Sequence, residues 1–230
     1  MTGMEYPDIR ENIERVRAGA GGADILLATK TVDCGRIEFA VRECGVKYIG
    51  ENRVQELLEK YDKLKDLPCE IHFIGTLQKN KVKYIIDKVS LIHSVGSIPL
   101  CEEIDRQAAK RGVIMNVLCE VNIGCEENKS GFLPEEVPEA FEKMLGFEHV
   151  RPLGLMTMAP KCQISADYIK FFTKTYRLFI DNCVQKVDNR YKPILSMGMS
   201  DSYIQAVSCG ATMIRVGSAV FGERTAEIKK

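Results

Sequence analysis

Short apolar runs alternate with amphipathic stretches along nearly the whole chain of 230 residues. The apolar runs are typical of buried strands and cover residues 23–31, 46–52, 69–75, 90–95, 113–124, 150–159, 192–200 and 211–222. The amphipathic stretches between them predict helices over 33–45, 53–64, 79–89, 98–112, 134–145, 165–187 and 201–210. Strands that alternate with helices pair in parallel, and eight such units predict an α/β fold that is a closed (β/α)8 TIM barrel. A doubly wound open sheet is the alternative.

One more helix is expected before the first strand, because residues 7–18 are amphipathic. The eight strand–helix units use the whole length, so residues 1–230 are expected to form a single domain with no linker. Helix punctuation agrees with these boundaries. Asp33 or Cys34 is placed to cap the first barrel helix, and Gly45 follows its end.

Composition excludes several classes of function. Thirty-two basic and 32 acidic residues give a net charge of zero with no basic stripe, so a nucleic-acid partner is not expected. No apolar run is long enough to span a membrane, and the polar N-terminus is unlike a signal peptide, so a cytoplasmic protein is expected. The nine cysteines lack CxxC spacing and only three histidines occur, so no metal site is predicted. Most cysteines are expected to be buried and reduced.

Lys30 is the unusual residue at the end of the first apolar run. Its side chain could reach water along an apolar stem, or it could be a partly desolvated amine that acts as a nucleophile. Barrel proteins carry their sites at the carboxyl ends of the strands, so the other polar residues at strand ends are the informative ones. These residues are Glu51, Asn52, Gln78, His93, Asn122, Thr157, Ser196, Ser200, Arg215 and Ser218.

The last two strands end in glycine and small hydroxyl residues, in "SMGMSDS" and "RVGSAVFG". Barrels often bind phosphate with the loops after strands 7 and 8, where glycine lets backbone N–H groups approach the anion. Ser200 and Ser218 lie where the following helices begin. The two segments therefore favour a phosphate site, and the alternative is that both serines only cap helices.

Arg215 lies inside an apolar strand and needs a partner, which could be a carboxylate, a ligand anion or a ring nitrogen. A strand-end lysine that faces a phosphate site suggests a Schiff base to an aldehyde cofactor with a phosphate arm. Pyridoxal 5′-phosphate carries both groups. An arginine against the pyridine nitrogen would leave that nitrogen unprotonated and weaken the ring as an electron sink.

At these positions the sequence resembles the pyridoxal phosphate homeostasis protein family. The segments that carry the resemblance run from residue 26 to 224 and are "LLATKT", "YIGENRVQEL", "HFIGTLQKNK", "GLMTMAP", "LSMGMSDSYIQAV" and "IRVGSAVFGER". The resemblance implies a barrel like the N-terminal domain of bacterial alanine racemase, with Lys30 as the Schiff-base lysine. It further implies a cofactor pocket in which phosphate contacts come from Ser200, Gly217 and Ser218, and the pyridine nitrogen faces Arg215. Asn52 and Ser196 are then expected to line the pocket, with Met197 and Met199 packed nearby.

One segment departs from the family pattern. Family members often follow the cofactor lysine with a second lysine and a proline, whereas this chain has Thr31 and Val32 there. A role of the second lysine in passing the cofactor on is therefore not carried over to this chain.

Two functions fit this pattern. The first is a carrier that holds pyridoxal phosphate, buffers its aldehyde and delivers it to PLP-dependent apo-enzymes. The second is an amino-acid racemase or decarboxylase. Barrel racemases use a tyrosine from a second β-domain across a dimer, and the chain is expected to lack that domain, because it ends just after the eighth strand unit. Proton transfer on both faces of a substrate needs a group on each face. The carrier, a monomer without catalytic residues, is therefore the prediction.

Overall fold

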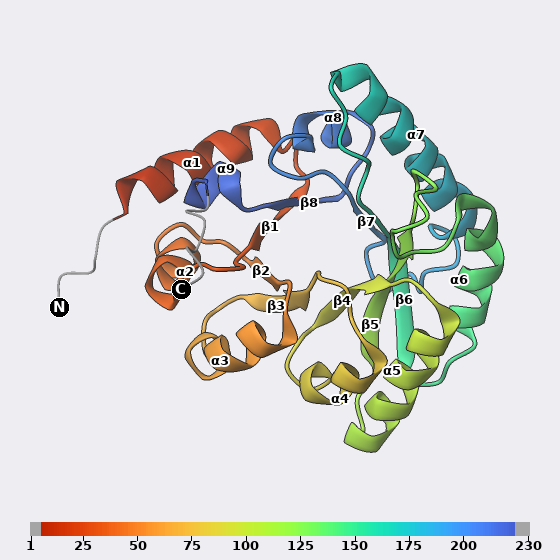
Figure 1. Ribbon diagram of the computed structural model, residues 1–230. Helices are drawn as coiled ribbons and strands as arrows, with labels where there is room; N and C mark the ends of the chain where they lie inside the picture. The colour runs from red at the N-terminus through yellow and green to blue at the C-terminus, as the bar shows by residue number, and fades with distance from the viewer. Residues whose placement is uncertain (1–5, 224–230) are drawn as a thin grey trace.

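The computed structural model describes residues 6–223 and shows a closed barrel of eight parallel strands (Figure 1). The strands pair in chain order, and β8 pairs with β1 to close the barrel. Their bounds are β1 Asp24–Ala28, β2 Tyr48–Glu51, β3 Glu70–Phe73, β4 Leu91–Val95, β5 Met115–Val121, β6 Val150–Thr157, β7 Ile194–Ser196 and β8 Met213–Val216. This confirms the predicted (β/α)8 barrel and excludes the open sheet.

Helices surround the barrel and include the predicted extra helix, α1, at the N-terminal side. The α-helices are α1 Pro7–Gly19, α2 Cys34–Arg42, α3 Val54–Leu64, α4 Val82–Ile85, α5 Ile98–Arg111, α6 Val137–Leu145, α7 Ser165–Asn182, α8 Tyr203–Ser208 and α9 Ser218–Phe221. Two 3-10 turns, η1 Lys79–Lys81 and η2 Pro134–Glu136, precede α4 and α6. The helix predicted over 79–89 is therefore shorter, and α7 ends before residue 187.

The first barrel helix begins and ends as its sequence predicts. The Asp33 side chain accepts a hydrogen bond of 3.0 Å from the backbone N–H of Arg36, which satisfies one free donor of the helix N-terminus. Gly45 follows the last turn with φ +64°, a conformation that glycine adopts without strain. Asp33, rather than Cys34, is thus the capping residue.

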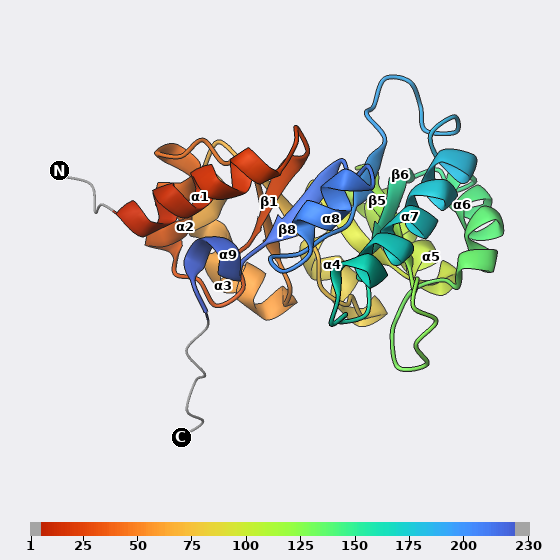
Figure 2. The ribbon, with the colours of Figure 1, turned by 90° about the horizontal axis from the view of Figure 1, so that it is seen from above.

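An apolar layer between the barrel and the helices forms most of the core. Its α1 side is made by Ile9, Ile13 and Val16, each at most 2% exposed. Both ribbon views place α1 beside α9 (Figures 1 and 2), and the Asn12 side chain donates to the Val220 carbonyl over 3.0 Å. The extra helix therefore supports the segment that directly follows β8.

The barrel interior has a different character, because side chains alternate across each strand. A small apolar cluster of Leu26, Ile74 and Met213 lies apart from the outer layer. Buried polar side chains share the interior with it: His72, His93, Ser196 and Arg215. A polar interior is unusual for a packed barrel, whose interior layers are mostly apolar.

Membrane spans, metal sites and disulfides can be examined in the structure for residues 6–223. In that range no helix combines the length and apolar character needed to cross a membrane, and no cluster of metal-ligating side chains occurs. All nine cysteines lie in this range and are free thiols. Only four are buried, Cys44, Cys101, Cys119 and Cys183, so the expectation that most are buried is wrong.

We predict that α1 is an integral part of the fold rather than an appendage. Ile13→Ala removes a side chain that is 1% exposed, and should lower the free energy of unfolding by about 3 kcal/mol. Ile169→Ala on α7, where the side chain is 42% exposed, should change it by less than about 0.5 kcal/mol. Urea unfolding of both variants measures this difference, and equal effects would contradict it.

Candidate functional site

A cavity of about 600 Å³ opens at the carboxyl ends of the strands. Six of the eight predicted site residues line it: Lys30, Asn52, Ser200, Arg215, Gly217 and Ser218. They follow or end four different strands, β1, β2, β7 and β8, so only the closed barrel brings them together. The remainder of the lining is Ala28, Ile74, Met158, Met199, Asp201 and Glu223.

The other two predicted residues, Ser196 and Met197, are fully buried and do not line this cavity. Ser196 lies behind the wall, where its hydroxyl oxygen accepts a hydrogen bond of 2.7 Å from Arg215. Met197 belongs to the outer apolar core, because strand alternation turns it away from the barrel interior. Met199, the other methionine expected near the pocket, is 36% exposed and lines the cavity. Direct contact of Ser196 or Met197 with a cofactor stays a prediction.

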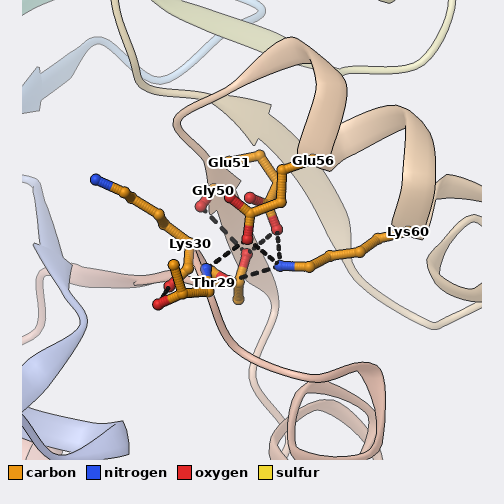
Figure 3. Close-up of polar contacts among 7 residues, drawn as sticks. Thr29, Lys30, Gly50, Glu51, Glu56 and Lys60 are labelled. Carbon is orange, nitrogen blue, oxygen red and sulfur yellow. Dashed lines mark hydrogen bonds and ion pairs between the residues drawn. The ribbon is translucent and has the colours of Figure 1, made fainter. Parts of the chain in front are cut away.

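The turn that carries Lys30 is anchored on both sides (Figure 3). Before it, the Thr29 hydroxyl donates to Glu51 over 2.7 Å and the Thr29 N–H donates to the Gly50 carbonyl over 3.0 Å. After it, the Thr31 N–H donates to the Glu56 carboxylate. Thr31 has φ +63°, a left-handed conformation that a β-branched residue rarely adopts. The neighbours of Lys30 are thus fixed, while its own side chain extends away from the cluster in Figure 3.

The centre of this anchor is the ammonium group of Lys60. Its Nζ lies 2.8 Å from the Thr29 carbonyl oxygen, 3.0 Å from Glu51 Oε1 and 2.7 Å from Glu56 Oε1. Glu51 is fully buried, and burial raises the pKa of its carboxyl while the nearby Lys60 charge opposes that rise. Three acceptors occupy Lys60, which leaves Lys30 as the one amine among the described residues that line the cavity.

Sequence reasoning missed Lys60. The i,i+4 spacing of Glu56 and Lys60 on α3 is a visible signal for an ion pair. The burial of the pair against Glu51 depends on the contact between α3 and the end of β2, which the sequence does not show.

The Ser200 hydroxyl joins the loops after β7 and β8. Its oxygen accepts hydrogen bonds from the backbone N–H groups of Gly217, at 3.1 Å, and Ala219, at 3.2 Å. Gly198 lets the loop after β7 lie close against α8. It has φ +90°, and a Cβ there would lie 2.5 Å from the Ala206 Cβ. Ser200 therefore does not cap the helix that follows it, α8, and instead accepts from N–H groups at the start of α9, where these donors converge.

Arg215 reaches the cavity from inside the barrel and is 5% exposed. Besides the bond to Ser196, its Nη2 donates to the Thr157 carbonyl over 2.9 Å. Within residues 6–223 it forms no ion pair, which removes the carboxylate alternative for its partner there. Burial lowers the pKa of Arg215 to about 10, against a smaller opposing effect of the Glu120 carboxylate, so the guanidinium stays charged at neutral pH.

Two buried histidines continue inward from Ser196. His93 Nδ1 lies 3.1 Å from the Ser196 hydroxyl oxygen, and His93 Nε2 lies 3.0 Å from His72 Nδ1. Burial lowers the pKa of both histidines, and the Arg215 charge acts in the same direction on His93. Both imidazoles are therefore neutral at pH 7. His72 is thus a hydrogen-bonded core histidine, and His93 is buried behind the cavity rather than in its lining.

We predict that these histidines make the fold less stable in mild acid. Their pKa values are lower in the folded chain than the value of about 6.5 in an unfolded chain, so the unfolded chain binds more protons below pH 6.5. The free energy of unfolding should fall as the pH drops from about 7 to 5.5, and less steeply in the double variant His72→Gln/His93→Gln. Carboxyls with a raised pKa, such as Glu51, are present in both proteins, so their contribution cancels in the difference between the two pH curves. Parallel pH curves from urea unfolding would refute this.

We also predict that the Lys60 anchor stabilises the fold strongly. Lys60→Met leaves a buried carboxylate without its counter-charge and should lower the free energy of unfolding by about 3 kcal/mol. Lys143→Met is the matched control, because it breaks an exposed i,i+4 pair with Glu139 and should hardly change the free energy of unfolding. Chemical denaturation measures both, and similar losses would show that the anchor has no special role.

Comparison with known proteins places this chain in a family. The family described as "Alanine racemase, N-terminal domain" matches residues 5–225. The "Pyridoxal phosphate homeostasis protein" of Aquifex aeolicus is 45% identical over 219 residues, covering 94% of this chain and 93% of that protein. The protein of the same name from Pseudomonas aeruginosa is 33% identical over 227 residues, covering 94% and 96%.

Solved structures agree with these relatives. PipY of Synechococcus elongatus, with PLP bound, has a TM-score of 0.81 at 29% identity and matches over 93% of this chain and 100% of that chain. An alanine racemase of Clostridium difficile, at 17% identity, shares the fold with a TM-score of 0.75, over 96% of this chain and 58% of the racemase chain. The curated relatives are named as homeostasis proteins and not as enzymes. The chain belongs to the pyridoxal phosphate homeostasis protein family and has its alanine racemase-like barrel.

Proposed function

We propose that this protein binds pyridoxal 5′-phosphate as a Schiff base on Lys30 and takes part in intracellular PLP homeostasis, by buffering and delivery without strong catalysis. The observation that carries the proposal is the shared cavity. It brings one half-buried amine, a convergent set of N–H and hydroxyl donors, and a charged arginine into one space. The name of the relatives and the PLP-bound PipY structure support the same cofactor.

The hydrogen-bond donors around α9 form the proposed site for the phosphate group of the cofactor. The N–H groups of Gly217 and Ala219 point to one oxygen position, which the Ser200 hydroxyl now holds. Phosphate oxygens suit such donors, and the charge of the anion favours a helix start. Gly217 and the exposed Ser218 lie beside this point in the cavity lining. The residues present therefore fit a phosphate group, with Ser200, Gly217 and Ser218 as its ligands.

Arg215 and Asn52 are the residues proposed to contact the pyridine ring of the cofactor. When bound, the cofactor supplies an aldehyde that a neutral amine can capture. Arg215 offers further N–H donors beyond those used by Ser196 and Thr157, and it has no acceptor atom. It can therefore donate to a ring nitrogen but cannot give that nitrogen a proton at neutral pH. Asn52 lines the opposite part of the cavity, beyond β2.

The lining explains why a carrier is proposed rather than an enzyme. Within residues 6–223 it contains no tyrosine, histidine or cysteine that could oppose Lys30 as a second acid or base. Its carboxylates, Asp201 and Glu223, are both exposed. Arg215 further disfavours stabilisation of a carbanion. PLP-dependent apo-enzymes are the recipients we propose, with the protein acting as a cytoplasmic monomer.

The amine assignment has a direct test. After incubation with pyridoxal phosphate and reduction by borohydride, mass spectrometry should map the added pyridoxyl group to the peptide that contains Lys30. Lys30→Ala should abolish both the addition and the imine absorption band. Lys174→Ala, which changes an exposed lysine on α7, should leave both unchanged. Modification spread over several surface lysines would contradict the proposal.

The loaded protein also distinguishes carrier from enzyme. Incubated with a panel of L-amino acids, it should show no racemisation or decarboxylation above the rate of free pyridoxal phosphate. Turnover at enzyme-like rates that is lost in Lys30→Ala would instead support the racemase or decarboxylase. Transfer to an added apo-enzyme, followed by the recovery of that enzyme's activity, tests delivery.

A further inference from the structure

A continuous chain of buried polar side chains crosses the barrel interior behind the cavity. It begins at Arg215 on β8, passes through Ser196 on β7 and His93 on β4, and reaches His72 on β3. The successive donor–acceptor distances are 2.7, 3.1 and 3.0 Å. At the far end, His72 Nε2 lies 3.6 Å from the half-exposed carboxylate of Glu70, at the start of β3. The chain thus runs from the cavity towards the opposite face of the barrel.

One direction of these hydrogen bonds gives the Ser196 and His93 protons an acceptor each. A guanidinium has only donors, so Arg215 must donate to the Ser196 oxygen. The Ser196 oxygen has a second lone pair, but only an unprotonated His93 Nδ1 gives the Ser196 proton an acceptor among these partners, so a fully bonded hydroxyl selects that form of His93. A neutral His93 therefore carries its proton on Nε2 and donates it to His72 Nδ1. His72 in turn carries its proton on Nε2, which faces Glu70 at 3.6 Å and has no hydrogen-bond partner among the described residues.

In this arrangement of protons, the Ser196 hydroxyl group points its hydrogen at His93 Nδ1. Because the Ser196 hydroxyl donates to His93, a lone pair of its oxygen is free to accept from Arg215. The guanidinium is then held between that oxygen and the Thr157 carbonyl. His93 is fully buried, so water cannot replace it as the acceptor without opening the core. The orientation of Arg215 at the cavity wall thus depends on a residue that does not line the cavity.

We propose that His93 and His72 are positioning residues, which act through Ser196 to hold the Arg215 guanidinium in the orientation that meets the cofactor's ring. The contact with the cofactor's ring rests on the proposed function. The positions of the protons on Ser196, His93 and His72 do not. Neither histidine touches the cavity, so neither is a catalytic residue. Their effect is transmitted by hydrogen bonds whose strength depends on the charge of Arg215.

The first experiment reads the proton order in the wild-type protein without cofactor. Nitrogen NMR of protein labelled in its three histidines distinguishes the two neutral tautomers and the imidazolium. His72 and His93 should both be neutral, with the proton on Nε2, from pH 6.5 to 8. A His93 that is charged, or that carries its proton on Nδ1, would overturn the inference whatever the cofactor does.

The second experiment compares two variants at position 93. Gln keeps an acceptor and a donor on one side chain, whereas Leu keeps a comparable volume and removes both. His93→Leu should raise the dissociation rate of pyridoxal phosphate roughly tenfold and shift the absorption maximum of the bound cofactor, because Arg215 loses its fixed orientation. His93→Gln should stay within about twofold of the wild type at an unchanged maximum. Thermal unfolding is recorded for both.

The outcomes separate the two proposals. If wild-type protein forms no borohydride-trapped link on Lys30, the proposed function fails, and the NMR result still decides the proton order. If the link forms but both variants keep the wild-type dissociation rate and absorption maximum, the positioning role is wrong. If His93→Leu and His93→Gln weaken binding equally in step with lost stability, the histidine is merely structural and the inference also fails. Should His93→Leu not fold, His72→Leu, which removes the next link, takes its place under the same criteria.

Discussion

The ammonium group of Lys60 ties together the ends of the first two strands and the helix that follows them. It bonds the carbonyl of Thr29, directly after β1, and the buried carboxylate of Glu51, at the end of β2. An unpaired charge in that position would be strongly unfavourable, so the three elements can meet only with the ion pair in place. The left-handed conformation of Thr31 is held by the same cluster. Lys30 is presented to the cavity because hydrogen bonds hold the residues on both sides of it.

The opposite wall of the cavity follows the same logic with hydrogen bonds instead of ion pairs. Ser200 connects the loops after β7 and β8, and Ser196 connects Arg215 to the histidines of the interior. Each of these contacts joins residues from strands or loops that are distant in sequence. The site is therefore a property of the closed barrel, and a change in the register of one strand would disperse it.

The sequence alone predicted the architecture well, because alternating strand and helix patterns with clear helix caps constrain a barrel strongly. Lys30, Asn52, Ser200, Arg215, Gly217 and Ser218 could be predicted to share one cavity, since strand-end positions and glycine-rich turns have a known place in this fold. The burial of Lys60 and the link between His72 and His93 could not be predicted. Both depend on which side chains face each other across non-consecutive elements, and no local pattern encodes that.

The central claim is that one fixed amine captures an aldehyde whose phosphate arm lies against the loops after β7 and β8. A crystal structure of the protein with pyridoxal phosphate tests it most directly. The account predicts continuous density from Lys30 Nζ to the cofactor, phosphate oxygens within hydrogen-bond distance of the Gly217 N–H and the Ser200 hydroxyl, and Arg215 beside the ring nitrogen. A cofactor bound elsewhere, with Lys30 unlinked and those loops empty, would contradict it.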